Sequence, residues 1–178
     1  PKVSNELLQA GLLAISLSLA AMLFYIWIRF EWQFSLGAII ALIHDVIITV
    51  GIFSLLSYEI NLSIIAAVLT IVGYSMNDTV VIFDRVRENL KKYSKVSISE
   101  ISNVSTNQTL SRTLITSVTT LLALFSIYIF GGAILKGFSF AMIVGVIVGT
   151  YSSIFVATPI LNYTKVNQKP VLKEDNNI

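Results

Sequence analysis

Residues 61–89 read NLSIIAAVLTIVGYSMNDTVVIFDRVREN, an apolar run with one acid, Asp78, near its end and a basic cluster just beyond it. About 20 apolar residues are enough for a helix to cross the hydrocarbon core of a membrane, which is roughly 30 Å thick. A charged carboxyl at the bilayer centre costs about 2.5–3.5 kcal/mol on insertion scales, so it must be hidden, paired or protonated. The stretch therefore predicts a membrane helix, and Asp78 is a candidate for moving protons or ions.

The composition of the whole chain is that of a membrane protein. Of its 178 residues, 55% are hydrophobic and 12% are charged, and the mean hydropathy is +0.81; soluble domains carry roughly 25% charged residues. The absence of cysteine excludes a disulfide scaffold and a thiolate metal site, and the single histidine, His44, excludes a His-rich metal cluster. No nucleotide loop, zinc signature or hydrolase elbow occurs. We therefore expect no enzyme activity, no catalytic residue, no cofactor or metal, and no nucleic-acid partner.

Five apolar runs are long enough to span a membrane, so we predict an all-α fold, a polytopic membrane helix bundle with five transmembrane helices. The predicted spans are residues 7–28, 34–56, 62–83, 109–130 and 138–161. They form a transmembrane domain over residues 1–163, which has one long connection at residues 84–108. The polar residues 164–178 predict a disordered tail.

The distribution of Lys and Arg predicts the orientation, because connections rich in these residues stay in the cytoplasm. One set of connections carries nine of them: Arg29, Arg85, Arg87, Lys91, Lys92, Lys95, Lys165, Lys169 and Lys173. The other set carries only Lys2 and Lys136. We therefore expect the 84–108 connection and the C-terminal tail to be cytoplasmic.

Two short patterns concern helix ends. The SISE sequence at residues 97–100 is a capping-box pattern followed by apolar residues at helical spacing, and it predicts a short amphipathic helix at the membrane surface. A solvated basic loop is an equally good interpretation of the same segment. Pro159, near the end of the fifth span, predicts that the helix terminates there.

Polar residues in the third and fourth spans recur at helical spacing, so each set is predicted to share one helix face. The third-span face comprises Thr70, Gly73, Tyr74, Asn77 and Asp78, and the fourth-span face comprises Gln108, Arg112, Thr116 and Thr119. Because Asp78 and Arg112 lie at similar depth, antiparallel helices allow them to pair. Burial disfavours the ionised carboxyl and the guanidinium favours it, which suggests a switch: a proton on Asp78 releases the two helices. The alternative is a static pair or a snorkelling arginine.

His44 and Asp45 stand near the middle of the second span. Adjacent helical residues point about 100° apart, which argues against one shared site of the catalytic-dyad kind. Either residue is a candidate for a proton relay. A buried, hydrogen-bonded structural polar pair is the favoured interpretation.

Four long motifs closely resemble the SecF family of protein-export membrane subunits. They are ALIHDVIITVGIFSL at 41–55, GYSMNDTVVIFDRVREN at 73–89, NQTLSRTLITSVTTLLAL at 107–124 and GFSFAMIVGVIVGTYSSIFVATPIL at 137–161. The motifs follow the order of the family and cover nearly the whole chain. Only Met76 departs mildly, since many members carry isoleucine there.

The resemblance implies a function. SecF is similar in membrane architecture to the resistance-nodulation-division exporters and pairs with SecD in the bacterial cytoplasmic (inner) membrane. Together they use the proton-motive force to help secreted polypeptides through the SecYEG translocon. A full SecF has six spans and a periplasmic domain after the first, so this chain is expected to begin just before the second span. The expected partners are SecD, SecYEG, secreted polypeptides and membrane lipid.

The resemblance also implies site residues. The aspartate of the family's GYS-x-NDT motif falls on Asp78 and the arginine of its SRT motif on Arg112, and both are implicated in proton transport in the family. Tyr74, Asn77 and Thr79 belong to the first motif and are expected to support the route. The full supporting polar route is then predicted to be Thr70, Tyr74, Asn77, Thr79, Gln108 and Thr116. The family's principal proton-carrying aspartate lies in SecD.

Other functions remain to be distinguished. The chain would also suit a proton-coupled exporter of small molecules or lipids of the same superfamily. A purely structural subunit, in which Asp78 and Arg112 only dock helices, is a third hypothesis. An intramembrane hydrolase is poorly supported because no nucleophile and base converge in the sequence.

Overall fold

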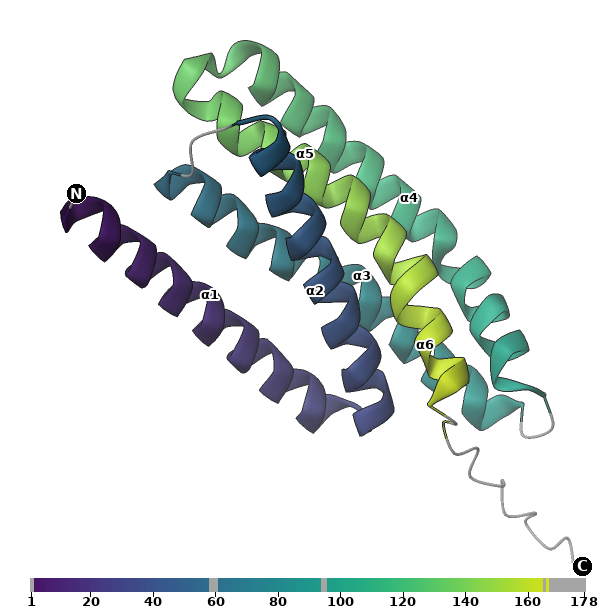
Figure 1. Ribbon diagram of the computed structural model, residues 1–178. Coiled ribbons are helices and arrows are strands. Elements are labelled where there is room, and N and C mark those ends of the chain that lie inside the picture. Colours follow the sequence, from purple (N-terminus) through teal and green to yellow (C-terminus); the bar gives the residue numbers. More distant parts are fainter. Residues whose placement is uncertain (1, 58–60, 94–95, 165, 167–178) are drawn as a thin grey trace, which may run out of the picture.

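The computed structural model describes residues 2–57, 61–93, 96–164 and 166, and these residues form a bundle of long helices (Figure 1). The helices are α1 (Lys2–Arg29), α2 (Trp32–Leu55), α3 (Leu62–Lys92), α4 (Ile98–Phe130) and α5 (Gly132–Ser152), followed by the π-helix η1 (Ser153–Ala157) and α6 (Thr158–Tyr163). No strand occurs in the described ranges. Five segments are long and apolar enough to cross a membrane, the fifth running from α5 through α6. The predicted all-α membrane bundle is confirmed.

The long connection predicted at residues 84–108 is mostly helix. α3 continues to Lys92, and α4 begins after Ser97, whose side chain accepts a hydrogen bond from the backbone N–H of Glu100 at 3.3 Å. The helix that starts there runs unbroken to Phe130, so it is the first part of α4 and neither a separate surface helix nor a loop. With 31 residues, α3 is about 46 Å long and extends well beyond a hydrocarbon core of roughly 30 Å. The disordered tail predicted at 164–178 lies outside the described residues except for Thr164 and Val166.

The bundle has two central and two peripheral helices. Half of the span residues of α3 and of the α5–α6 segment are buried, whereas only 12% are buried in α1 and 17% in α4. α3 and α5 approach closely because α5 carries glycine at the contact: a Cβ on Gly149 would stand 3.0 Å from Cβ of Ser75. α1 lies on the outside, apart from α4 and α5 (Figure 1). Side chains on α3 are therefore the best placed to meet several helices at once.

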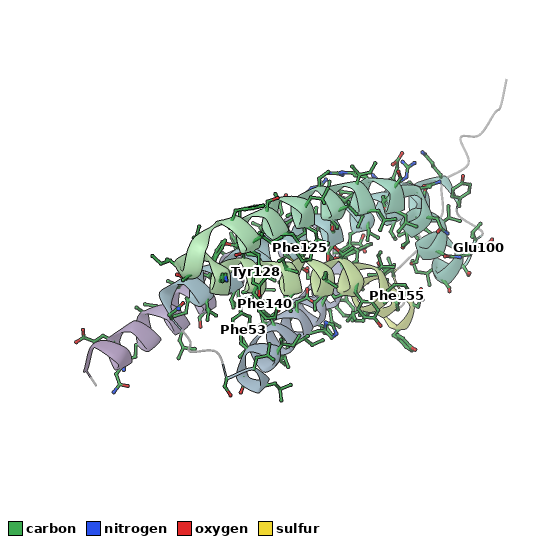
Figure 2. The ribbon with its side chains drawn as sticks, turned by 90° about the horizontal axis from the view of Figure 1, so that it is seen from above. Phe53, Glu100, Phe125, Tyr128, Phe140 and Phe155 are labelled. Carbon is green, nitrogen blue, oxygen red and sulfur yellow. The ribbon has the colours of Figure 1, made fainter. Side chains whose placement is uncertain are left out.

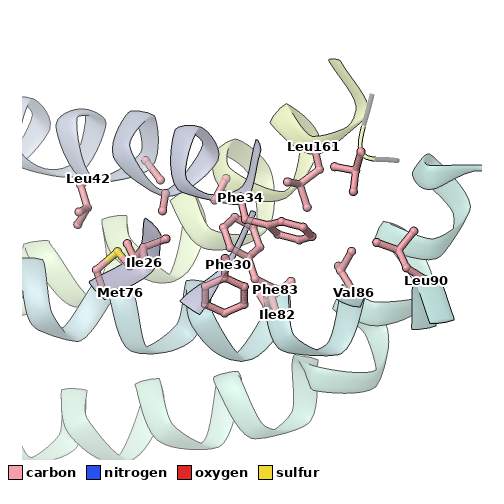
Figure 3. Packing of buried hydrophobic residues seen from close by; sticks show 14 of the residues in the cluster. Ile26, Phe30, Phe34, Leu42, Met76, Ile82, Phe83, Val86, Leu90 and Leu161 are labelled. Carbon is pink, nitrogen blue, oxygen red and sulfur yellow. The ribbon is translucent and has the colours of Figure 1, made fainter. Parts of the chain in front are cut away.

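Aromatic side chains fill two parts of the core. Phe30, Phe34 and Phe83 are at most 5% exposed and pack with ring centroids 5.2–6.2 Å apart, joining the α1–α2 corner to α3 (Figure 3). Phe140 packs against Phe53 and Tyr128 at the other end of the bundle from Glu100 (Figure 2). Edge-to-face aromatic pairs contribute about 0.5–1.5 kcal/mol beyond their buried area. These two clusters hold the ends of α2, α3 and α5 in place.

Basic residues gather at one end of the bundle, which we call the basic end: Arg29, Arg85, Arg87, Lys91 and Lys92. Arg29 Nη2 donates to Asp84 Oδ1 at 3.0 Å, and Arg87 Nη1 donates to the carbonyl of Arg29 at 3.3 Å. Because the Arg29–Asp84 pair is about half exposed, it contributes at most about 1 kcal/mol. These contacts bring the end of α1 close to the basic part of α3. The distribution of Lys and Arg predicts that both segments lie on the same side of the membrane.

The last span does not terminate at Pro159 as predicted. The helix continues through Pro159 to Tyr163, and the turn before it widens into η1. Proline lacks the N–H that would bond to the carbonyl four residues earlier, and its ring clashes with that carbonyl. A π-turn relieves the clash, and Thr158 Oγ1 donates to the Ser153 carbonyl at 2.8 Å. Such π-turns are rare and often occur at functional sites.

Candidate functional site

Asp78 is a buried acid with one unpaired carboxyl oxygen. It lies on α3 and is 4% exposed, and its Oδ2 has no hydrogen-bond partner in the part of the chain that the structure describes. Buried polar atoms are nearly always hydrogen-bonded, so a carboxyl oxygen left alone needs an explanation.

Arg112 is the cation that acts electrostatically on Asp78. It lies on α4 and is exposed, and it lines a cavity of about 310 Å³ with Val81, Asp84, Arg85, Glu88, Gln108 and Thr109. Among the described residues, ion pairs join Arg29 to Asp84 and Glu88 to two cations, but none joins Asp78 to Arg112. The direct pair that the sequence spacing allowed is therefore not formed in this structure.

Hydrogen bonds between α3 and α4 explain why the two charges do not touch. Asn89 Nδ2 donates to Ser105 Oγ at 2.8 Å, and Arg85 Nε donates to Gln108 Oε1 at 2.7 Å. This antiparallel register puts Arg112 level with Val81, about one helix turn nearer the basic end than Asp78. A long arginine side chain then reaches toward water at that end. A small relative sliding of α3 and α4 would bring the charges together.

The residues predicted to share one face of α3 differ in burial across that face. Asp78 is buried and Tyr74 is half-buried, with its hydroxyl oxygen lacking a partner among the described residues, whereas Thr70, Gly73 and Asn77 are exposed. Thr70 Oγ1 donates to the carbonyl of Ala66 in its own helix, at 2.8 Å. One edge of the face is therefore turned into the bundle and the other edge is turned outward.

The polar face predicted for α4 is not the buried one. Gln108, Arg112 and Thr119 are exposed, and the Thr116 hydroxyl donates to the carbonyls of Arg112 and Thr113 in its own helix. The face turned into the bundle carries a different set, Ser105, Thr109, Thr113 and Ser117. Its run of small hydroxyl residues at i, i+4, i+8 and i+12 was readable in the sequence and was missed.

A second acid is buried in the middle of the bundle. Asp45 on α2 is 1% exposed, and its Oδ2 accepts hydrogen bonds from Ser75 Oγ at 2.5 Å and Ser152 Oγ at 2.8 Å. Its Oδ1 lies 3.0 Å from His44 Nδ1. The argument that adjacent residues point too far apart to meet is wrong, because the side-chain torsions bring the two groups together. The hydrogen-bonded polar pair that we favoured is present.

Thr79 belongs to the same buried layer. It is 1% exposed, and its hydroxyl pairs with Ser153 Oγ at 2.8 Å. The sequence analysis did not assign the serines of α3, α5 and η1 to any site. Within the described ranges, no three His, Asp or Glu side chains converge on a metal position.

Comparisons with known proteins give one result. Residues 1–167 match the family described as protein export membrane protein SecD/SecF, C-terminal. Among curated proteins, the protein translocase subunit SecF of Cereibacter sphaeroides is 51% identical over 168 residues, which cover 94% of this chain and 52% of that protein. The SecF of Rickettsia bellii is 56% identical over 90% of this chain and 53% of its own length. The chain thus spans about half the length of these relatives.

Solved structures agree. A crystal structure of SecDF, a translocon-associated membrane protein from Thermus thermophilus, superposes with a TM-score of 0.89 at 44% identity, over 93% of this chain and 23% of that one. A second, a SecDF in a super-membrane-facing form, gives a TM-score of 0.79 at 47% identity, over 83% and 20% of the two chains. The fold described above is therefore one already seen in a translocon-associated membrane protein.

Proposed function

Because this chain belongs to the SecD/SecF family of protein-export membrane proteins, we propose that it forms the proton-driven membrane part of a SecF-type subunit. In this proposal it works with SecD in the bacterial cytoplasmic membrane and uses the proton-motive force to assist secreted polypeptides through the SecYEG channel. The basic end is cytoplasmic, as is the C-terminus, because Lys and Arg stay on that side. The observation that carries the proposal is the buried, partnerless Asp78 within electrostatic reach of Arg112.

Protonation of Asp78 changes the force between α3 and α4. Ionised Asp78 is attracted to Arg112. A proton on the carboxyl removes that attraction. Among the described residues, Asp78 Oδ2 has no hydrogen-bond partner and no ion pair holds Arg112, so neither contact resists a change in position.

The magnitude is sufficient for a motor. One proton crossing 100 mV releases about 2.3 kcal/mol. Moving a two-state equilibrium from 1:99 to 99:1 requires about 5.5 kcal/mol. About three protons per cycle, crossing 100 mV, therefore suffice to drive a conformational change of this size in the bundle.

The cavity at the basic end offers access from the cytoplasm. Its walls include Arg112, Gln108 and Glu88, and it reaches Val81, which lies one turn short of Asp78 on α3. Polar walls of this kind admit water into a membrane protein. A proton leaving Asp78 would then have only about one helix turn to cross before it meets water.

A partner such as SecD is supported by the outer face of α3. Ala66, Thr70, Gly73 and Asn77 are exposed and recur at i, i+4, i+7 and i+11. Thr70 is satisfied within its own helix, but lipid would leave the Asn77 amide unpaired, whereas small residues allow a second helix to approach closely. The solved relatives are SecDF proteins, so the helix that packs there is proposed to come from SecD.

One observation favours an alternative, a proton-coupled exporter of small molecules or lipids. A groove of about 520 Å³ lies between α1 and α3 and is lined mainly by apolar side chains, including Met22, Tyr25 and Met76. Copurification separates the two functions. A subunit for protein export should purify with SecD and SecYEG, whereas an exporter should purify without the channel.

The proposed function is tested by Asp78→Asn in the complete translocase complex. We expect export driven by a proton gradient to stop while SecD and SecYEG still copurify, because asparagine keeps the shape and cannot carry the charge. Normal proton-driven export by an assembled Asp78→Asn complex would refute the role of Asp78.

A further inference from the structure

The buried contacts of Asp45 join three helices at one level of the bundle. Its Oδ2 accepts from Ser75 on α3 at 2.5 Å and from Ser152 at the end of α5 at 2.8 Å, and Asp45 itself lies on α2. Hydrogen bonds from small hydroxyl side chains are among the contacts that hold membrane helices together. We call this group, with the Thr79–Ser153 pair, the serine node.

The π-helix directs two consecutive serines into the node. Ser152 ends α5 and bonds to Asp45, while Ser153 begins η1 and bonds to Thr79 at 2.8 Å and to the Ser75 carbonyl at 3.3 Å. Both serines are fully buried. The Ser152 hydroxyl reaches α2 and the Ser153 hydroxyl reaches α3, so two adjacent residues tie the end of α5 to both helices.

The node brackets Asp78 along α3. Ser75 precedes Asp78 by three residues and Thr79 follows it directly, so both ties lie within one turn of the acid. Asp78 Oδ2 has no hydrogen-bond partner among the described residues. The position of Asp78 relative to Arg112 and to water therefore depends on the hydrogen bonds that Ser75 and Thr79 make to α2 and η1.

We infer that Asp45 is a positioning residue: through Ser75 and Ser152 it holds α3 in the place where Asp78 is buried and apart from Arg112. This inference rests on the proposed role of Asp78. It adds that the resting state is set by the serine node, and that loosening the node lets Asp78 move toward Arg112.

The node is suited to positioning because Asp45 uses its two carboxylate oxygens for different neighbours. Its Oδ1 lies 3.0 Å from His44 Nδ1, whereas its Oδ2 accepts from both serines. Tyr151 of α5 stacks on His44, with ring centroids 6.5 Å apart, and covers that side of the pair. The contact with His44 therefore does not compete with the hydrogen bonds from the two serines.

The test measures how readily Asp78 is protonated in the assembled complex. Dicyclohexylcarbodiimide, a lipid-soluble reagent, adds to protonated carboxyls, and peptide mass spectrometry reports the labelled residue. Ser75→Ala and Ser152→Ala each remove one hydroxyl from the node and keep the Asp45 charge. Ser139→Ala is the matched control, because Ser139 is buried on α5 and its hydroxyl donates only to the Leu135 carbonyl of its own helix.

We expect labelling of Asp78 at a fixed pH to fall about threefold or more in Ser75→Ala and Ser152→Ala. The reason is that a released α3 brings Asp78 closer to Arg112, which favours the ionised form. Ser139→Ala should label as wild type, and Ser152→Thr, which keeps the hydroxyl, should restore labelling. If Ser75→Ala fails to assemble with SecD, the inference is tested by comparing the labelling of Ser152→Ala with that of Ser152→Thr.

The outcomes separate this inference from the proposed function. Labelling of both node variants at the Ser139→Ala rate refutes the positioning role and leaves the role of Asp78 intact. Normal proton-driven export by Asp78→Asn refutes the proposed function, even where the node variants change labelling. Both results are read from complexes that retain SecD.

Discussion

The contact between α3 and α5 yields a prediction whose size follows from the structure. A Cβ on Gly145 would overlap Cγ1 and Cδ1 of Ile71 and stand 2.8 Å from its Cγ2, whereas carbon atoms in contact prefer about 3.5–4.0 Å. Ile71 is 1% exposed and has no room to retreat. Overpacking of this kind costs about 1–3 kcal/mol. Gly145→Ala should therefore be destabilised by that amount, less the gain from replacing a helical glycine.

That gain is measured separately with Gly51→Ala. Gly51 lies inside α2, and a Cβ there meets no heavy atom within 4 Å, so this variant should be more stable by about 0.5–1 kcal/mol. The assay is a titration of the complete subunit with denaturing detergent in mixed micelles, which gives the free energy of unfolding. The difference between the two variants reports the steric cost alone.

A double-mutant cycle assigns the cost to Ile71. Ile71→Ala removes the atoms that the new Cβ would meet, so the double variant should recover about 1–3 kcal/mol relative to the sum of the single changes. Equal stability of Gly145→Ala and Gly51→Ala would show that α3 and α5 are not packed as closely as described, and the placement of Ser75 beside Ser152 would lose its basis.

Three further predictions test the core, the partner face and the switch. Phe83→Ala should lower the free energy of unfolding by about 3–5 kcal/mol in the same titration, while Phe155→Ala, at a side chain that is 61% exposed, should change it little; similar losses would contradict the core assignment. A Cβ on Gly73 meets no heavy atom within 4 Å, so Gly73→Ala should leave folding intact but reduce copurification of SecD by hindering close helix approach. Gly51→Ala, where a Cβ also meets nothing, should not reduce it, and unchanged recovery of SecD with Gly73→Ala would place the partner elsewhere. Arg112→Lys keeps the charge and loses the planar fork, so proton-driven export should fall about three- to tenfold without stopping; a wild-type rate would show that charge alone is required.

The polar faces of α3 and α4 show what could not be predicted from the sequence, namely which face of a helix is buried. Periodicity correctly grouped residues onto faces, but it chose the outward face of α4 because Arg112 and Gln108 are the more polar residues there. The inward face carries Thr109 and Thr113, whose small hydroxyls fit between helices that approach closely. Which of two polar faces is buried depends on the neighbouring helices, and that is not contained in the helix itself.

The sequence by itself determined the number of spans, the charged end of the bundle and the two acids within the membrane, because hydrophobic length and the cost of burying charge are local properties of the chain. Only the tertiary structure decided that Asp45 binds serines of two other helices, that His44 turns to meet it and that Asp78 is left without a partner. Those contacts join residues up to 107 positions apart. They exist because glycines and a π-turn let particular helices approach, and such an approach is a property of pairs of helices.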